Sequence, residues 1–224
     1  MTKRLPAAVL WDMDGTIVDT EPYWMQAEIE LVNEFGGTWT HEDALRMVGM
    51  GLWDAAEVFR GAGVDLPADA IVHRLTERVR EQLAQHGVPW QPGAQELLRQ
   101  VRDAGVPTAL VTMSIRSMAE DVVGAIAFAA FDELVTGDEV AAPKPHPEPY
   151  LAAAGRLGVD IAECIAIEDS PTGLASATSA GAVAIGVPHM IPIPADRADA
   201  VWPTLEGRTL DDLVALLDGK RVGA

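Results

Sequence analysis

The sequence predicts an α/β fold, in which a parallel sheet is covered by helices on both faces and a helical segment follows the first strand. Short apolar runs recur along the chain, helix-like patterns separate them, and residues of about 20 to 88 contain no strand-like run. Alternating strands and helices are typical of parallel sheets, whose strands are apolar throughout because both faces are buried.

The first strand is expected in the run AAVLW at residues 7–11, directly before Asp12. Similar runs predict the remaining strands at 106–112, 133–136, 164–168 and 182–187. Apolar residues at helical spacing predict helices at 95–104, 150–157 and 172–180. A last helix is expected to begin at a capping-box-like pair, Thr209 and Asp212, and to end at Gly219.

Three apolar stripes at helical spacing interrupt this rhythm. They run from Trp24 to Phe35, from Leu52 to Phe59 and from Val72 to Leu83. We therefore expect two units, an α/β core of residues 1–19 and 89–224 and an inserted helical unit of residues 20–88.

The composition is that of a globular chain with an acidic surface. Apolar residues make up 49% of the 224 residues, and 34 acidic against 16 basic residues give a net charge of -18. This charge should repel nucleic acid and anionic membranes, so neither is expected as a partner. No obligatory protein partner is evident. An anionic ligand would need local cations or a metal ion.

Cys164 is the only cysteine, so no intramolecular disulfide can form, which is typical of a reducing compartment. It lies in the apolar run CIAI and is expected to be a small core residue. No signal peptide is visible, because Asp12 and Asp14 interrupt the first apolar stretch. The expected location is the cytoplasm.

Asp12 and Asp14 directly follow the first predicted strand, in the segment DMDGT. Ligands of open parallel sheets bind beyond the carboxyl ends of the strands. One carboxylate there could attack phosphorus while the other transfers a proton, and the pair could bind a cation. An ordinary Asp-Gly turn explains these five residues equally well.

Thr112 ends the second predicted strand, and Lys144 lies between prolines in PKPHP at 143–147. A hydroxyl and an ammonium can both donate to phosphate oxygens. Of the three lysines, Lys144 alone lies far from both ends of the chain, and the prolines restrict its backbone. The alternatives are a helix N-cap for Thr112 and a solvated loop position for Lys144.

Glu168 and Asp169 end the predicted strand CIAI. Mg²⁺ commonly binds one or two carboxylates, so Asp169 beside Asp12 could complete a magnesium site. Acidic residues at a helix N-terminus are the alternative explanation. All of these candidates lie at or just beyond the carboxyl end of a predicted strand, where a doubly wound sheet would bring them together.

These segments resemble, in order, the four motifs of the haloacid dehalogenase-like hydrolases: DMDGT at 12–16, VTMS at 111–114, PKPHP at 143–147 and IEDS at 167–170. The helical insertion resembles the C1-type cap of that superfamily. The resemblance implies a Rossmann-like catalytic core and a magnesium-dependent phosphatase. It also implies a small phosphorylated metabolite as substrate, in particular a sugar phosphate, and an aspartyl-phosphate intermediate.

The resemblance further implies a role for each candidate residue. Asp12 would be the nucleophile, and Asp14 would act as general acid and then as general base. Thr112 and Lys144 would bind the phosphate. Mg²⁺ would be held by Asp12, the backbone carbonyl of Asp14 and Asp169, with Glu168 alongside.

Other chemistries of the superfamily are less consistent with the sequence. Dehalogenases lack the second aspartate, which is present here as Asp14, and phosphonatases use a cap lysine, which residues 20–88 do not contain. A sugar-phosphate mutase similar to beta-phosphoglucomutase is an alternative. Against it, the cap segment GMGL at 49–52 has no arginine for a second phosphate, and Trp24 replaces a histidine, although Arg46 could reach inward. A non-catalytic phosphate-binding regulatory protein is the other alternative.

Overall fold

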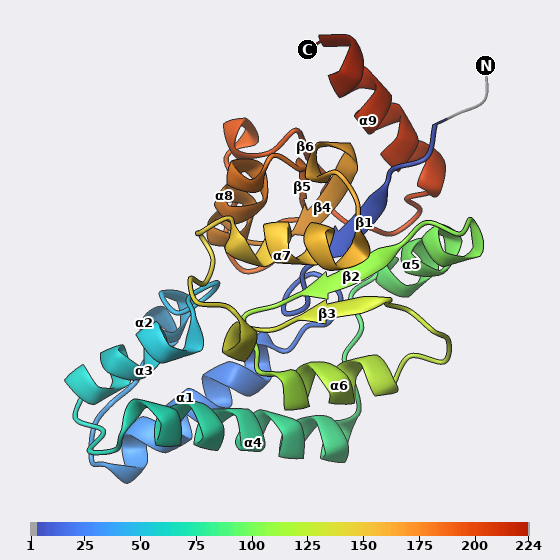
Figure 1. The fold of residues 1–224 in the computed structure, drawn as a ribbon. Helices are drawn as coiled ribbons and strands as arrows, with labels where there is room; N and C mark the ends of the chain where they lie inside the picture. The colour runs from blue at the N-terminus through green and yellow to red at the C-terminus, as the bar shows by residue number, and fades with distance from the viewer. Residues whose placement is uncertain (1–3, 224) are drawn as a thin grey trace.

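The computed structural model describes residues 4–223, in which six strands form one parallel sheet (Figure 1). The strands are β1 (Ala8–Trp11), β2 (Thr108–Val111), β3 (Glu133–Val135), β4 (Cys164–Glu168), β5 (Val183–Gly186) and β6 (Ala200–Val201). Their order is β3-β2-β1-β4-β5-β6. The order reverses between β1 and β4, which is the switch point where open α/β sheets bind ligands. The predicted α/β fold is confirmed.

Strand residues alternate between two apolar layers. Ala8 and Leu10 face a layer that contains α7 (Glu148–Leu157) and α8 (Pro171–Ala180). Val9 and Trp11 face a layer that contains α5 (Ala94–Asp103), α6 (Arg116–Gly124) and α9 (Leu210–Gly223). All four β1 side chains are 0% exposed, as expected for a central strand covered on both faces.

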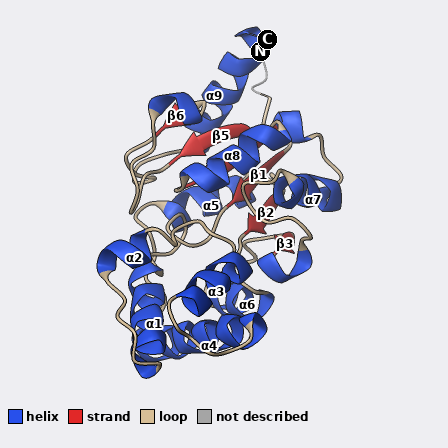
Figure 2. Ribbon diagram, turned by 90° about the vertical axis from the view of Figure 1, so that its left-hand side faces the viewer, coloured by secondary structure: helices blue, strands red, loops and turns tan. Residues whose placement is uncertain are grey.

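The segment after β1 forms four helices, which lie together below the strands in Figure 2. They are α1 (Glu21–Glu34), α2 (His41–Leu45), α3 (Leu52–Gly61) and α4 (Ala68–His86). α4 packs against both α1 and α3. The sequence did not predict α2, because this helix has only five residues. The helix begins at a capping box formed by Thr40 and Asp43. The division into core and cap at residues 20 and 88 stays a prediction.

The predicted end of the last helix is wrong, because α9 continues through Gly219 to Gly223. A glycine inside a helix costs only about 1 kcal/mol relative to alanine, which is too little to end it. The predicted start is confirmed, since the Thr209 backbone N–H and hydroxyl both donate to Asp212 Oδ2 at 2.8 Å.

Three short 3₁₀ turns complete the described chain: η1 (Gly137–Glu139), η2 (Ile161–Glu163) and η3 (Ala195–Arg197). Cys164 is fully buried, and this burial raises the pKa of its thiol to about 12, as expected for a core residue. Among the described residues, no helix has both the length and the apolar composition needed to cross a membrane.

Candidate active site

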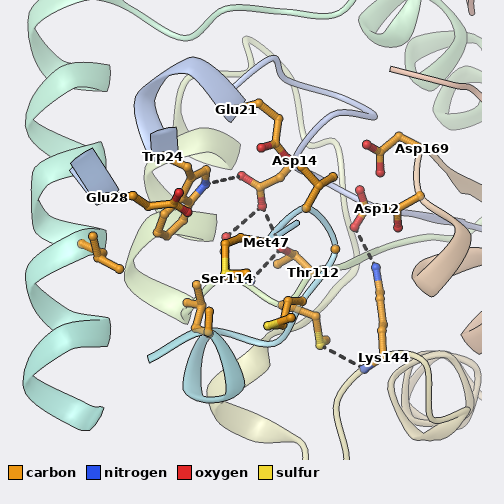
Figure 3. A pocket seen from close by; sticks show the side chains of 18 of the residues that line it. Asp12, Asp14, Glu21, Trp24, Glu28, Met47, Thr112, Ser114, Lys144 and Asp169 are labelled. Carbon is orange, nitrogen blue, oxygen red and sulfur yellow. Dashed lines mark hydrogen bonds and ion pairs between the residues drawn. The ribbon is translucent and has the colours of Figure 1, made fainter. Parts of the chain in front are cut away.

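Asp12 lies at the carboxyl end of β1, in the centre of the sheet. Its backbone N–H donates to the carbonyl of Ile167 at 3.0 Å, so the strand pairing extends to this residue. β2 and β4 flank β1, and they bring Thr112 and Asp169 to the same edge (Figure 3). At Gly15, φ is +85° and a Cβ would lie 2.1 Å from Asp169 Oδ2. Only glycine fits this turn.

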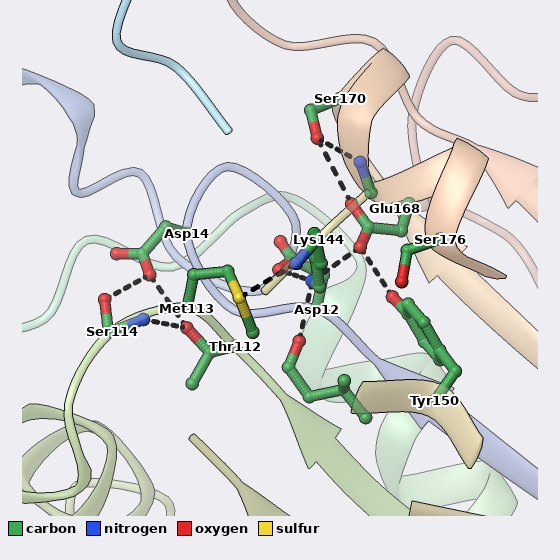
Figure 4. A network of polar contacts seen from close by, with 12 residues as sticks. Asp12, Asp14, Thr112, Met113, Ser114, Lys144, Tyr150, Glu168, Ser170 and Ser176 are labelled. Atoms are coloured by element: carbon green, nitrogen blue, oxygen red, sulfur yellow. Dashed lines mark hydrogen bonds and ion pairs between the residues drawn. The ribbon is translucent and has the colours of Figure 1, made fainter. Parts of the chain in front are cut away.

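Lys144 is held in a buried network rather than in solvent (Figure 4). Its Nζ donates to Asp12 Oδ1 at 2.7 Å, to Glu168 Oε1 at 2.6 Å and to the carbonyl of Val111 at 2.8 Å. These contacts use all three donors of the ammonium. The Tyr150 hydroxyl donates to the same Glu168 oxygen at 2.5 Å. The interpretation of Lys144 as a solvated loop residue is therefore wrong.

The charges of this cluster shift one another's pKa values. Burial lowers the pKa of Lys144, but the charges of Asp12 and Glu168 outweigh burial and hold it above its usual value, so Lys144 stays protonated. Burial and the charge of Glu168 together raise the pKa of Asp12 to about 7, although Lys144 opposes the rise. Burial, together with Asp12 and Glu168, raises the pKa of Asp169 well above its usual range. The cluster therefore has more negative charge than Lys144 can balance.

Three buried carboxylates, those of Asp12, Glu168 and Asp169, offer oxygens that lie within 4.8 Å of one another. Asp12 Oδ2 is buried and accepts no hydrogen bond within the described structure. The ammonium of Lys144 is the positive charge that pairs with this group, through Asp12 and Glu168. A hard divalent cation that prefers oxygen ligands would balance this charge and occupy the free oxygen, so the residues present fit such an ion.

Asp14 is held by a second set of contacts, separate from the Lys144 network. Its Oδ1 accepts from the Thr20 hydroxyl at 2.5 Å and from Trp24 Nε1 at 3.2 Å. Its Oδ2 accepts from the hydroxyls of Thr112 at 3.2 Å and Ser114 at 2.8 Å. Thr20 and Ser114 were not among the predicted site residues, although the hydroxyls of the segments DT and VTMS were a visible signal.

One cavity beyond the strand ends contains most of these groups. It has about 740 Å³ of empty space, part of it open to solvent. From the core, its lining includes the predicted residues Asp12, Asp14, Thr112, Lys144 and Asp169. Glu168 does not line it, but lies behind Lys144. The inserted segment contributes Glu21, Trp24 and Glu28 of α1 and several apolar side chains, among them Met50, Leu52 and Phe59.

Comparison with known proteins agrees with this geometry. The model of the haloacid dehalogenase-like hydrolase family matches residues 6–181. Protein CbbY of Rhodobacter capsulatus is 34% identical over 208 residues, which cover 87% of this chain and 91% of that protein. Hexitol phosphatase B of Escherichia coli (strain K12) is 29% identical over 195 residues, which cover 84% of this chain and 86% of that protein. The chain belongs to the haloacid dehalogenase-like hydrolases.

The solved structures agree as well. CbbY from Rhodobacter sphaeroides, crystallised as a mutant in complex with xylulose-(1,5)bisphosphate, has a TM-score of 0.84 and 26% sequence identity to this chain. The match covers 91% of this chain and 96% of that one. The ligand of that CbbY structure is a sugar bisphosphate.

Proposed function

We propose that this protein is a magnesium-dependent phosphatase that hydrolyses small phosphomonoesters, in particular sugar phosphates. The observation that carries the proposal is the environment of Asp12. One carboxylate oxygen is fixed by Lys144 at 2.7 Å, and the other is buried without a partner, at the switch point of the sheet. This arrangement suits a carboxylate that both binds a cation and attacks phosphorus.

In the first step, an Asp12 oxygen attacks phosphorus, and the bond between phosphorus and the ester oxygen breaks. Asp14 gives its proton to the departing oxygen, and Asp12 now carries the phosphoryl group. When Asp12, Asp169 and the Asp14 carbonyl bind Mg²⁺, with Glu168 alongside, the ion supplies positive charge that offsets the repulsion between carboxylate and phosphate. Before substrate binds, Lys144 and Thr112 donate only to oxygens of the protein, so each exchanges one of these contacts for a phosphate oxygen and holds the group in line.

In the second step, Asp14 accepts a proton from water, whose oxygen attacks the phosphorus of the aspartyl phosphate. The bond to Asp12 breaks, and inorganic phosphate leaves. Asp14 therefore has to be held in both its protonated and its ionised form. The hydroxyls of Thr20, Thr112 and Ser114 can accept as well as donate, so the contacts around Asp14 serve both forms.

We also propose that residues 20–88 form a cap over a catalytic core of residues 1–19 and 89–224. The cavity supports this division, because the charged groups of the sheet edge form one side and α1 and α3 form the other. A cap over the site favours small substrates over proteins. The free, buried thiol of Cys164 supports the cytoplasm as the location.

The phosphatase is favoured over the mutase by the charges in the cavity. Arg46, the residue that could have reached inward, pairs with Asp43 and its side chain is 69% exposed. Among the described residues that line the cavity, Lys144 is the only cation. A relative that is named a hexitol phosphatase supports the same choice.

The test is phosphate release from a panel of sugar phosphates and other small phosphomonoesters, with Mg²⁺ and with EDTA. We expect release with Mg²⁺ and its loss with EDTA. A product that is an isomerised sugar phosphate instead of free phosphate would point to the mutase. Binding of these compounds without any turnover would point to the regulatory protein.

A further inference from the structure

Glu21, Trp24 and Glu28 share one face of α1, since they are spaced by three and then four residues. Each is at most 8% exposed, and all three line the cavity (Figure 3). Glu21 and Glu28 are two helical turns apart, about 10 Å along the axis. Trp24 lies between them and contacts Asp14, so Glu28 lies one turn further from the sheet edge.

The Glu28 carboxylate accepts one hydrogen bond from the protein, and its side chain lines the cavity. Trp39 Nε1 donates to Glu28 Oε2 at 3.0 Å, and the Trp39 ring is fixed against Phe59 with ring centroids 4.9 Å apart. Within the described structure, no other donor and no cation contacts the Glu28 carboxylate. Burial raises its pKa to about 7, which shows how poorly its charge is compensated. A buried carboxylate is costly unless further donors reach it, and a bound ligand can supply them.

The two ends of the cavity differ in charge. At the end of the cavity nearest the strands, Lys144 supplies a positive charge. At the far end lies Glu28, and the surrounding wall is apolar, with Leu52 and Phe59 among its residues. A second phosphate at this end would meet a carboxylate and no cation, whereas a hydroxyl could donate to the second oxygen of Glu28.

We propose that Glu28, positioned by Trp39, is a specificity-determining residue that accepts a hydrogen bond from a hydroxyl group at the end of the substrate remote from its phosphate. The charge of Glu28 rejects a second phosphate at that end. The substrates are therefore hydroxylated monophosphates, in contrast to the bisphosphate seen with CbbY. This inference rests on the phosphatase proposed above and names the substrate class of the same site.

The test compares the wild type with Glu28→Gln. The amide keeps the size of the side chain and still accepts from Trp39, but it has no charge. The substrates are fructose 1-phosphate, fructose 6-phosphate and glucose 6-phosphate, with fructose 1,6-bisphosphate and glucose 1,6-bisphosphate as matched bisphosphates. Acetyl phosphate, an acyl phosphate, is the short substrate, and it carries no hydroxyl to reach Glu28.

For Glu28→Gln we expect kcat/KM to fall about tenfold for the best monophosphate, because a hydrogen bond to a charged group is lost. We expect it to rise for the matched bisphosphate and to stay within about twofold for acetyl phosphate. Trp39→Phe removes the donor that positions Glu28 and should lower kcat/KM for the monophosphate alone. Glu34→Gln, an exposed position at the end of the same helix, is the matched control.

Unchanged selectivity in both Glu28→Gln and Trp39→Phe, with acetyl phosphate still hydrolysed, would overturn this inference and leave the phosphatase standing. No phosphate release by the wild type from any ester would instead overturn the phosphatase. In that case, Glu28 is tested by the rise in Tm that each sugar phosphate causes in the wild type and in Glu28→Gln. A smaller rise with the monophosphate and a larger one with the bisphosphate in Glu28→Gln would support the inference, and equal shifts would overturn it.

Discussion

The sheet edge and the α1 face enclose the same cavity, but their buried charges are satisfied to different degrees. At the sheet edge, Lys144 uses all three of its donors and Asp14 accepts from four groups, and the exception is Asp12 Oδ2, which has no partner in the described structure. On the α1 face, Glu28 accepts from Trp39 alone, and Glu21 has no hydrogen-bond or ion-pair partner among the described residues.

We infer from this difference that the sheet-edge residues carry out the reaction and that the α1 carboxylates select the substrate. Groups that are fixed before the substrate binds lose little free energy to reorganisation, and such preorganisation is what phosphoryl transfer requires. Carboxylates with few donors from the protein are stabilised further when a ligand supplies a donor. We therefore expect changes at the sheet edge to affect every ester, and changes on α1 to affect some esters more than others.

The largest effect is expected for Asp12→Asn. An amide cannot act as the nucleophile, so kcat should fall about 10⁴-fold or more for every phosphate ester and for acetyl phosphate. Phosphate release measures this, and circular dichroism confirms that the variant is folded. Activity near that of the wild type would rule out covalent catalysis by Asp12.

Asp14→Asn should have the next largest effect, and it should depend on the leaving group. Loss of the proton donor should lower kcat about 10²- to 10⁴-fold for sugar phosphates. The loss in the first step should be much smaller for acetyl phosphate, because acetate leaves without protonation. Single-turnover rates of the variant and the wild type with a sugar phosphate and with acetyl phosphate give the two losses. Equal losses would argue against Asp14 as the general acid.

Lys144→Met should destabilise the fold by about 3–5 kcal/mol, because it leaves the buried carboxylates of Asp12 and Glu168 without their cation. Urea unfolding without Mg²⁺ measures the loss. Lys220→Met removes a lysine that pairs with Asp199 and is 51% exposed, and it should cost less than about 1 kcal/mol. Similar losses in the two variants would mean that the buried network contributes no special stability.

Glu28→Gln should stabilise the protein, and the gain should grow with pH. The pKa of Glu28 is about 7 in the fold against an ordinary value of 4.5. Between these values the folded state binds more protons than the unfolded state, so stability from Glu28 is full below pH 4.5 and is lost as the pH rises through 7. Glutamine does not titrate, so its advantage should approach about 3 kcal/mol above pH 7.

Urea unfolding of the wild type and Glu28→Gln at pH 5 and pH 8 measures this difference, with Glu34→Gln as the control. A gain at pH 8 together with lost activity on sugar monophosphates would show that the α1 carboxylate is kept for binding at the expense of stability. A variant that is less stable than the wild type at pH 8 would contradict the idea that the Glu28 charge is poorly compensated.

Most of the sheet edge could be predicted from the sequence, because Asp12, Thr112 and Asp169 each end an apolar run. The close contacts of Lys144 could not be derived from spacing, since its loop returns to the sheet from outside any strand. β6 was missed because it has two residues. Glu28 was missed because the stripe from Trp24 to Phe35 was assigned to packing.

A signal for Glu28 was nevertheless present. It lies four residues after Trp24 and three before Leu31, so helical spacing places its carboxylate on the buried side of α1. A charged residue inside an apolar stripe is either paired or functional, and the sequence offers no nearby cation to pair with it. Its contact with Trp39 depends on the turn after α1, which helical periodicity does not describe.

The covalent step at Asp12 is tested most directly by trapping the phosphoryl enzyme. The Asp14→Asn variant is mixed with Mg²⁺ and ³²P-labelled acetyl phosphate, quenched in acid and digested, and the labelled peptide is identified by mass spectrometry. Because acetate needs no proton donor but the second step needs a base, we expect label to accumulate on Asp12 and to be released by hydroxylamine. Phosphate release without any label on Asp12, or label on another residue, would contradict the proposed mechanism.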